Sequence, residues 1–480
     1  MNKIVLIQPP DPPRSQVLRD HMGNFGILRK KISRVKADIL PPLNLTYSAA
    51  LLEENGFDVS IIDSPALELK TKEVLRMAEA YVPDLTIINV TCVSNSYDLD
   101  FSLKLKKAIN TTVAVTGPHL TLKPEIALQN KNIDLVIRGE IENTILELSQ
   151  RLPRIQDVKG IAFRRNKKII LTSDRQLITN LDILPFPSYH KLPMKRYRYH
   201  LLKKRPFTTV LTSRGCPFDC MYCPYPFGYG NVWRGRSVEN VLQEVKLLVE
   251  RFKIKSILFR DQVFSFDMQR AEKICDGIIK EDVDIQWRCE TRIDRVSKNL
   301  MTKMKKAGCS GIHFGVESGD PEILKFSKVG VNLDLVKKTF REAKEIGIET
   351  VAFFLVGLPG ETKESITKTI RLAKEIKSDI TWFNAPVPYP GTKLYELAEK
   401  NDWILDKNWE NYSGTEVVMR TDNLTADEIR SALEQIKKMF SERPLNLMGM
   451  ALSKRGVLTI LSNPKEAIKY AFDNFRQKKI

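Results

Sequence analysis

The chain has 480 residues, which is enough for two or three domains of about 100–200 residues each. Its formal net charge of +18 comes from Lys and Arg that are spread along the chain, a pattern that favours a solvated basic surface over a stable nucleic-acid site. No apolar run approaches the roughly 18 residues of a membrane-spanning helix or resembles a signal peptide, and the seven Cys are an odd number, so we expect a cytoplasmic protein without disulfides.

Residues 1–150 alternate short apolar runs with helical patterns, which is typical of a parallel sheet with helices on both faces. The expected strands are Lys3–Gln8, Asp58–Asp63, Asp84–Val90, Thr112–Thr116 and Asp134–Arg138. Ligands of such doubly wound sheets bind outside the carboxyl ends of the strands. We therefore expect the site in the loops that follow these strands, which provide Pro10, Asp63, Thr91, Ser94, Gly117, Pro118, His119, Gly139 and Glu140.

Residues 151–200 change in character and predict a connection between two domains. The segment from Ile161 to Leu171 has the pattern of a hairpin that turns at Asn166, and a proline-containing stretch from Leu184 to Ser188 follows it. We therefore expect a hairpin and a linker here, with a second domain beyond them.

A second α/β domain is predicted over residues 201–420, where strands and helices alternate again. The expected strands are Thr208–Thr212, Ser256–Phe259, Ile285–Glu290, Gly311–Gly315, Thr350–Val356 and Thr381–Pro386. Ser237 is the expected N-cap of the first helix. Six strand–helix units predict a partial parallel barrel, whose reactive face lies at the carboxyl ends of the strands.

Cys216, Cys220 and Cys223 form a compact motif directly after the first strand of this barrel. Iron–sulfur clusters are normally held by four Cys, so three thiolates so close together leave one iron of a four-iron cubane open to a substrate. A structural zinc site is the alternative. Zinc favours four ligands in paired Cys-x2-Cys units, and the chain has no second pair.

The cysteine motif resembles that of the radical S-adenosylmethionine (SAM) superfamily, and the resemblance covers about residues 207–400. It implies a 4Fe–4S cluster whose open iron binds SAM and reduces it to a 5′-deoxyadenosyl radical. The implied SAM contacts are Tyr222, Asp261, Arg292, Glu317, Ser318, Gly357 and Pro359. Any one of these charged residues alone is more often part of a barrel salt bridge. Arg260-Asp261-Gln262 stands where the superfamily usually has Gly-Gly-Glu.

The first domain resembles the cobalamin-binding domains that precede such barrels. The matching segments are residues 41–45, 51–56, 116–119 and 138–142, with Asn44 where the family usually has Gly. Many cobalamin enzymes supply an imidazole to cobalt from Asp-x-His-x-x-Gly, which is absent here, so the resemblance implies cobalamin without a protein imidazole ligand. It places His119 along the corrin or its tail, and a purely structural role for His119 is the alternative. The alternative is a sheet of the same fold without a cofactor.

Together the two resemblances imply a methyltransferase that acts on an unactivated carbon through methylcobalamin and a 5′-deoxyadenosyl radical. A cyclase or another carbon-skeleton enzyme of the same branch is the main alternative. A methylthiotransferase usually carries a second set of three Cys in its N-terminal domain, where this chain has only Cys92. A non-catalytic cobalamin or iron–sulfur sensor is a further alternative. The implied partners are a small-molecule or lipid-like substrate and an electron donor such as ferredoxin or flavodoxin.

Residues 421–480 are expected to be helical and basic. The segment from Ala451 to Ile480 carries seven Lys or Arg against two Asp or Glu, together with two apolar runs. A basic amphipathic segment can make peripheral contact with a membrane, but the pattern favours a helix that packs on the enzyme core. Trp403, Trp409 and Tyr412, which precede this segment, are expected either to cover the barrel mouth or to pack internally.

Overall fold

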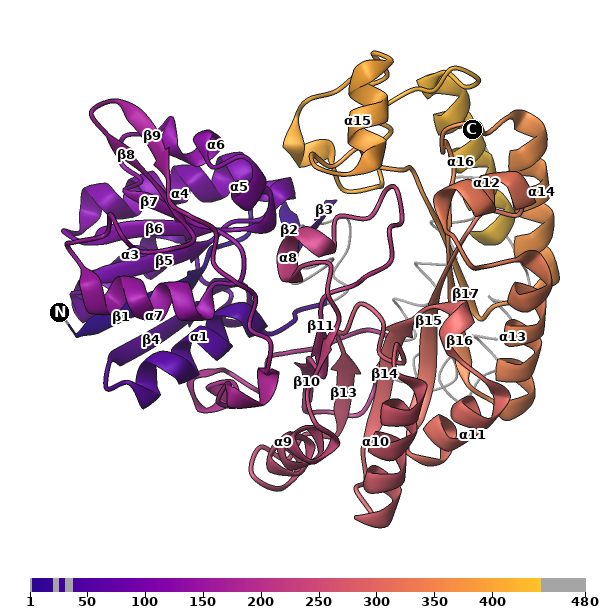
Figure 1. Ribbon diagram of the computed structural model, residues 1–480, viewed down its shortest axis with the longest axis horizontal. Helices are drawn as coiled ribbons and strands as arrows, with labels where there is room; N and C mark the ends of the chain where they lie inside the picture. The colour runs from indigo at the N-terminus through magenta and orange to yellow at the C-terminus, as the bar shows by residue number, and fades with distance from the viewer. Residues whose placement is uncertain (1, 20–25, 31–37, 442–480) are drawn as a thin grey trace, which may run out of the picture. The chain divides into compact units, whose positions relative to one another are not determined.

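The computed structural model describes residues 2–19, 26–30 and 38–441 (Figure 1). Its contacts divide the chain into two units, Met1–Ala426 and Asp427–Ile480. Helix α16 (Ala426–Ser441) forms the described part of the second unit from Asp427 onward, which agrees with the helical character expected after residue 421. The basic segment Ala451–Ile480 lies outside the described residues. In the part of the chain that is described, every helix is too short or too polar to cross a membrane.

The N-terminal sheet contains five parallel strands in the order expected for a flavodoxin-like fold. These strands are β4 (Asp58–Asp63), β1 (Lys3–Gln8), β5 (Leu85–Asn89), β6 (Thr112–Thr116) and β7 (Leu135–Ile137). The predictions for β1, β4 and β6 are confirmed, and those for β5 and β7 are one residue too long at each end. The carboxyl ends of all five strands meet at one edge.

Helices cover both faces of this sheet, as the sequence predicts (Figure 1). Helices α3 (Thr71–Tyr81) and α4 (Asn95–Ala108) contribute to one apolar core together with alternate residues of β1. Helices α1 (Leu43–Glu54) and α7 (Glu142–Arg151) pack against each other on the opposite face. Because side chains alternate along a strand, burial of both faces explains the continuous apolar run of β1.

The predicted hairpin is present, but it belongs to the N-terminal sheet and not to a separate linker. Strands β8 (Ile161–Arg165) and β9 (Lys168–Leu171) add two antiparallel strands beside β7. Asn166 and Lys167 form the turn with φ of +49° and +64°, the conformation that two-residue hairpin turns favour. The hairpin covers the edge of β7, which would otherwise leave unpaired backbone groups. The connection to the next domain therefore starts after Leu171.

The second domain is a six-stranded parallel sheet with helices between its strands, as predicted. Its strands are β10 (Phe207–Val210), β13 (Ser256–Phe259), β14 (Gln286–Thr291), β15 (Cys309–Glu317), β16 (Glu349–Leu355) and β17 (Ile380–Asn384). The helices that follow them are α9 (Val238–Glu250), α10 (Met268–Lys280), α11 (Lys298–Lys306), α13 (Leu333–Ile346) and α14 (Lys363–Glu375). The Ser237 side chain caps α9, as expected.

Residues of the linker reach both edge strands of this partial barrel. The Tyr199 ring stacks on Phe207 of β10 with 6.2 Å between centroids. The next residue, His200, lies 6.2 Å from the Trp382 ring of β17. The linker thus contacts the first and the last strand, which have no direct strand pairing with each other.

Candidate functional site

The loop that carries the three cysteines is fixed at both ends by the backbone. It follows the short strand β11 (Ser213–Arg214), which pairs with β12 (Arg234–Gly235). Gly215 has a φ of +83°, and a Cβ atom there would lie 2.0 Å from the Val232 carbonyl oxygen, so only glycine fits. The Cys216 amide donates to the Gly230 carbonyl at 3.2 Å. These contacts fix the positions of the two ends of the loop.

The three thiols of the loop are available as ligands. Cys216 is buried, Cys220 and Cys223 are half-buried, and all three are free of disulfides. Within the described ranges, no three Cys, His, Asp or Glu side chains converge on a point that could hold one ion. In a cubane cluster each Cys binds a different iron, so the three thiols do not have to meet at one point.

Two cations lie close to these thiols. The Arg292 Nη1 atom is 3.7 Å from Cys220 Sγ, and its guanidinium group stacks 3.8 Å above the centre of the Phe218 ring. Asp294 holds this guanidinium by two contacts of 2.8 and 3.0 Å. Burial raises the pKa of the Cys220 thiol, whereas Lys328 and Arg292 lower it. Iron and these cations together would favour the thiolate form that a cluster requires.

Glu317 and Tyr222 are brought together by a bulge at the end of β15. The pairing of β15 with β16 shifts between Gly315 and Glu317, and Glu317 has an unusual positive φ of 72°. Its Oε1 atom forms an ion pair with the buried Lys328 Nζ atom at 2.9 Å, and its carboxylate lies beside Tyr222. A Cβ atom on Gly315 would lie 2.2 Å from this carboxylate. The bulge and the glycine therefore direct Glu317 toward the cysteine loop.

Asp261 lies behind the cysteine loop. It is fully buried and accepts hydrogen bonds from the Thr212 hydroxyl at 2.8 Å and the Ser213 hydroxyl at 2.5 Å. Asp261 thus braces the segment that enters the loop. The next residue, Gln262, has a buried Oε1 atom without a hydrogen-bond partner among the described residues. Gln262 belongs to the segment Arg260-Asp261-Gln262, which the sequence places at the end of the second barrel strand in the position of the Gly-Gly-Glu motif.

Ser318, Gly357 and Pro359 lie in loops after β15 and β16. The Ser318 hydroxyl is 3.2 Å from that of Thr369, and the Gly357 amide donates to Glu361 Oε2 at 2.6 Å. Pro359 is buried in the same turn. Burial raises the pKa of Glu361 to about 7, and its other oxygen has no partner within the described ranges. Glu361 thus holds the loop that contains Gly357 by accepting a hydrogen bond from its backbone.

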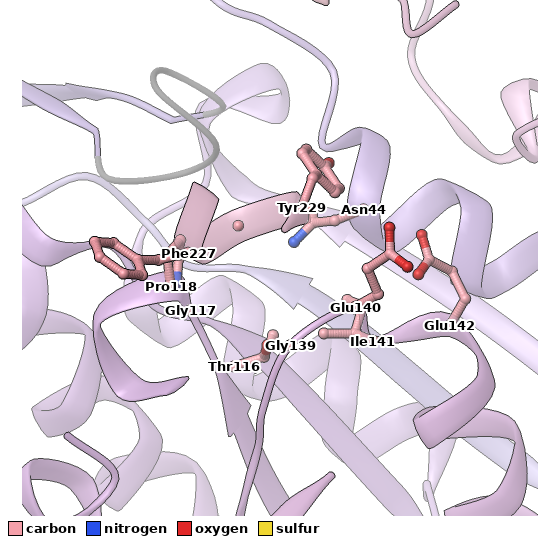
Figure 2. Close-up of a pocket in the computed structure, with 11 residues that line it drawn as sticks. Asn44, Thr116, Gly117, Pro118, Gly139, Glu140, Ile141, Glu142, Phe227 and Tyr229 are labelled. Atoms are coloured by element: carbon pink, nitrogen blue, oxygen red, sulfur yellow. The ribbon is translucent and has the colours of Figure 1, made fainter. Parts of the chain in front are cut away.

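A small pocket, with a cavity volume of about 40 Å³, lies at the carboxyl ends of β6 and β7 (Figure 2). One side is formed by the loops after these strands and by Asn44 of α1, and the other side by helix α8 (Pro226–Tyr229), which follows the cysteine loop. The lining residues are Asn44, Thr116, Gly117, Pro118, Gly139, Glu140, Ile141, Glu142, Phe227, Gly228 and Tyr229. Gly117, Pro118, Gly139 and Glu140 of the predicted site therefore meet in one pocket.

The pocket lining combines glycine backbone with polar side chains. The three glycines in its wall allow a ligand to approach the backbone closely. Gly117 is required for a further reason, because a Cβ atom there would lie 2.3 Å from the Val90 carbonyl oxygen. The Asn44 amide and the unpartnered Glu142 Oε2 atom provide hydrogen-bonding groups among the described lining residues. No histidine is among the residues that line the pocket within the described ranges.

Four other predicted residues, Pro10, Asp63, Thr91 and Ser94, do not line this pocket. The Thr91 and Ser94 hydroxyls are 2.5 Å apart, and Ser94 donates to the buried Asp98 at 2.6 Å. Asp63 accepts from the Tyr197 hydroxyl at 2.7 Å, and burial raises its pKa to about 6. The Pro10 carbonyl accepts from a buried Arg at 3.4 Å. Each of these groups thus has a partner inside the protein.

His119 is buried next to the pocket wall and has one free ring nitrogen. Its Nε2 atom is 2.9 Å from Asn95 Oδ1, and its Nδ1 atom has no partner among the described residues. Burial lowers the pKa of His119 to about 3, so the ring is neutral. Because Nε2 faces an acceptor, the proton belongs on Nε2 and Nδ1 is a free acceptor. The Trp409 ring lies 5.8 Å away.

The segment after the barrel packs on both halves of this region. The amide of Leu394, in helix α15 (Lys393–Lys400), donates to the Met221 carbonyl of the cysteine loop at 2.9 Å. Trp403 packs with Met221, whereas Trp409 packs in a cluster with Cys92 of the N-terminal domain. Of the two roles expected for these aromatic residues, the structure supports internal packing.

Comparisons with known proteins agree with this arrangement. Residues 30–149 match the B12 binding domain, and residues 210–373 match the radical SAM superfamily. The uncharacterized methyltransferase PH0819 of Pyrococcus horikoshii is 36% identical over 419 residues, which cover 86% of this chain and 90% of that protein. The anaerobic magnesium-protoporphyrin IX monomethyl ester cyclase of Rubrivivax gelatinosus is 25% identical over 403 residues, 81% of this chain and 71% of that protein.

A solved structure has the same fold. TsrM from Kitasatospora setae, a radical SAM methyltransferase solved with cobalamin and a 4Fe–4S cluster, aligns with a TM-score of 0.66 and 16% identity over 83% of this chain and 75% of that chain. Both domains are thus identified by sequence, and their combination recurs in a solved fold. The chain therefore belongs to the radical SAM enzymes that carry a cobalamin-binding domain, whose cofactors are a 4Fe–4S cluster, SAM and cobalamin.

Proposed function

We propose that this protein is a methyltransferase that delivers a methyl group to an unactivated carbon of a small-molecule or lipid-like substrate. One observation carries the proposal: helix α8, which begins three residues after Cys223, closes the pocket formed by the N-terminal sheet. A reaction that uses two cofactors needs both of them close to the substrate, because groups that are already placed lose little entropy in reacting. The name of the 36% identical relative, a methyltransferase, supports the same function.

We assign Cys216, Cys220 and Cys223 to three irons of the cluster. When bound, the cluster supplies the electron that cleaves SAM to the 5′-deoxyadenosyl radical, and cobalamin supplies the methyl group. Arg292 then offsets part of the negative charge of the cluster, because its guanidinium lies 3.7 Å from Cys220 Sγ. Asp261 accepts a hydrogen bond from Thr212, in the segment that leads into the cysteine loop, and is a positioning residue.

SAM contacts are assigned from unpartnered atoms and from the bulge. Gln262 Oε1 is a buried acceptor without a partner among the described residues, and it suits the ammonium group of SAM. Tyr222 and Glu317 lie side by side and suit the adenine and the ribose hydroxyls. The backbone at Gly357 and Pro359 forms a further wall, and Ser318 supports the turn through Thr369.

Cobalamin contacts are assigned to the pocket between the domains. Gly117, Pro118, Gly139 and Glu140 line it, and the free Nδ1 of His119 can accept a hydrogen bond from an amide of the cofactor. The neighbouring strand-end loops contain four further predicted residues, Pro10, Asp63, Thr91 and Ser94. We assign to these residues a role in stabilising their loops. No imidazole is assigned to cobalt.

The test needs no knowledge of the substrate. The protein is purified anaerobically, reconstituted with iron, sulfide and hydroxocobalamin, reduced, and given SAM with a deuterated methyl group. A methyltransferase should form about one equivalent of S-adenosylhomocysteine per bound corrinoid and should place the label on the extracted corrinoid. It should also form 5′-deoxyadenosine. Formation of 5′-deoxyadenosine without S-adenosylhomocysteine would contradict the proposal.

A cyclase is the second candidate, and the 25% identical cyclase of Rubrivivax gelatinosus favours it. A cyclase uses the radical without delivering a methyl group, so the same assay separates the two functions. An electron donor of the ferredoxin or flavodoxin type would replace the chemical reductant in either case. Its addition in place of dithionite should sustain 5′-deoxyadenosine formation.

A further inference from the structure

Four buried charged side chains connect the pocket with the cysteine loop. Glu140 and Glu142 follow β7 in the N-terminal domain, and Arg214 and Arg234 lie on β11 and β12 of the second domain. Each side chain is at most 5% exposed. Figure 2 shows the two carboxylates side by side at the pocket. Two negative and two positive groups balance, so we expect no net attraction for a free ion.

The contacts between the four groups are short. Arg214 Nη2 donates to Glu142 at 2.7 Å, and Arg214 Nη1 lies 3.5 Å from Glu140. Arg234 Nη1 is 2.8 Å from Glu140 Oε1 and also donates to the Ile178 carbonyl at 2.8 Å. The Arg214 guanidinium further lies over the rings of two tyrosines, Tyr47 at 5.0 Å and Tyr229 at 5.1 Å. The arginine position is therefore fixed from several sides.

These side chains belong to both candidate sites at once. Glu140 and Glu142 line the pocket, and Arg214 stands two residues before Cys216. A buried charge that loses its partner is strongly destabilised, so the carboxylates and the arginines cannot move independently. A displacement of Glu140 and Glu142 in the pocket wall should therefore also displace Arg214, which lies in the segment that enters the cysteine loop.

We propose that Glu140 and Glu142 are positioning residues that fix the cluster relative to the cobalamin pocket. The inference rests on the cofactor assignment of the proposed function and adds a role that the pocket lining alone does not give. Glu142 Oε2 is buried and has no partner among the described residues. It is available to a donor on a bound cofactor, such as a corrin amide. Filling the pocket would then tighten the same network that holds the cysteine loop.

The test compares Glu142→Gln with Glu147→Gln. Glu147 lies on the same helix, is half-buried, and pairs with Arg151 and Arg175 outside the pocket lining. Both proteins are reconstituted with the cluster and cobalamin and reduced until cob(II)alamin and the paramagnetic cluster are both present. The magnetic interaction between the two spins, seen as altered relaxation of the cobalt signal in electron paramagnetic resonance, reports their separation.

We expect Glu142→Gln to keep its iron and corrinoid content but to change or lose this interaction, while Glu147→Gln matches the parent protein. An unchanged interaction in Glu142→Gln would overturn the inference. Absence of corrinoid in the parent protein would instead refute the cofactor assignment on which the inference rests, and corrinoid content reveals this separately. Failure to form S-adenosylhomocysteine concerns only the methyltransferase proposal, because the spin measurement does not depend on methyl transfer.

A second measurement covers the case in which Glu142→Gln does not fold. Hydrogen exchange of the unmodified, cluster-containing protein is followed with and without hydroxocobalamin. Peptides that cover residues 213–216 do not line the pocket, so the inference expects cobalamin to slow their exchange through the charged network. Unchanged exchange in these peptides, together with slower exchange in residues 227–229 of the pocket wall, would overturn it.

Discussion

Replacement of Gly215 by Ala should abolish cluster binding while leaving the fold intact. Gly215 has a φ of +83°, and an added Cβ atom would lie 2.0 Å from the Val232 carbonyl oxygen. Cβ atoms essentially never approach a heavy atom closer than 3.0 Å, so the backbone must move by about 1 Å (3.0 − 2.0) directly before Cys216. The positive φ itself costs Ala about 1 kcal/mol.

Gly56→Ala is the matched control. Gly56 has a similar φ of +79°, but an added Cβ atom there meets nothing within 4 Å. It therefore carries the same backbone strain, about 1 kcal/mol, without the displacement. Iron and sulfide content after anaerobic reconstitution, together with the thermal unfolding midpoint, measures both effects. We expect Gly56→Ala to bind a full cluster and Gly215→Ala to bind little iron. Equal iron content in the two variants would refute the reasoning.

Three further changes test other parts of the site. Arg292→Ala should make the reduction potential of the cluster more negative, because a cation 3.7 Å from Cys220 Sγ stabilises the reduced cluster, which carries more negative charge. Redox titration measures the potential. An unchanged potential would contradict the prediction. Burial raises the pKa of Glu361 to about 7 from 4.5, so stability present below pH about 4.5 is lost as the pH rises through 7. In the parent protein, this lowers the free energy of unfolding by about 3 kcal/mol. Glu361→Gln should remove most of this decrease, so its free energies of unfolding at pH 5 and pH 8 should differ less than those of the parent protein. Cys216→Ala should lose iron and SAM cleavage, whereas Cys275→Ala, a buried thiol outside the loop, should retain both.

Much of the architecture follows from local sequence patterns. The predicted strands Lys3–Gln8, Asp58–Asp63, Thr112–Thr116 and Ser256–Phe259 coincide with β1, β4, β6 and β13. Strands of a parallel sheet that are buried on both faces must be apolar throughout, so these runs are visible without a structure. The cysteine spacing and the Ser237 cap are also short-range signals, because all the residues concerned lie within one loop or one turn.

The sequence alone could not distinguish the residues that line the pocket from those of the neighbouring loops. Gly117, Pro118, Gly139 and Glu140 meet in one pocket, whereas Thr91 and the other residues of the neighbouring loops have partners inside the protein. All of them follow a parallel strand, so the sequence could name the correct edge of the sheet. It could not show which loops remain open at that edge, because this depends on the packing of side chains from distant segments.

By itself, the sequence determined the two α/β domains, the cysteine loop and the chemistry that this loop is suited to. Only the tertiary structure decided that the hairpin joins the N-terminal sheet and that Glu140 and Glu142 meet Arg214 and Arg234, which lie 72 to 94 positions further along the chain. The physical reason is range. Periodicity and spacing report what neighbouring residues require, whereas the pairing of buried charges across two domains depends on which surfaces the fold brings into contact.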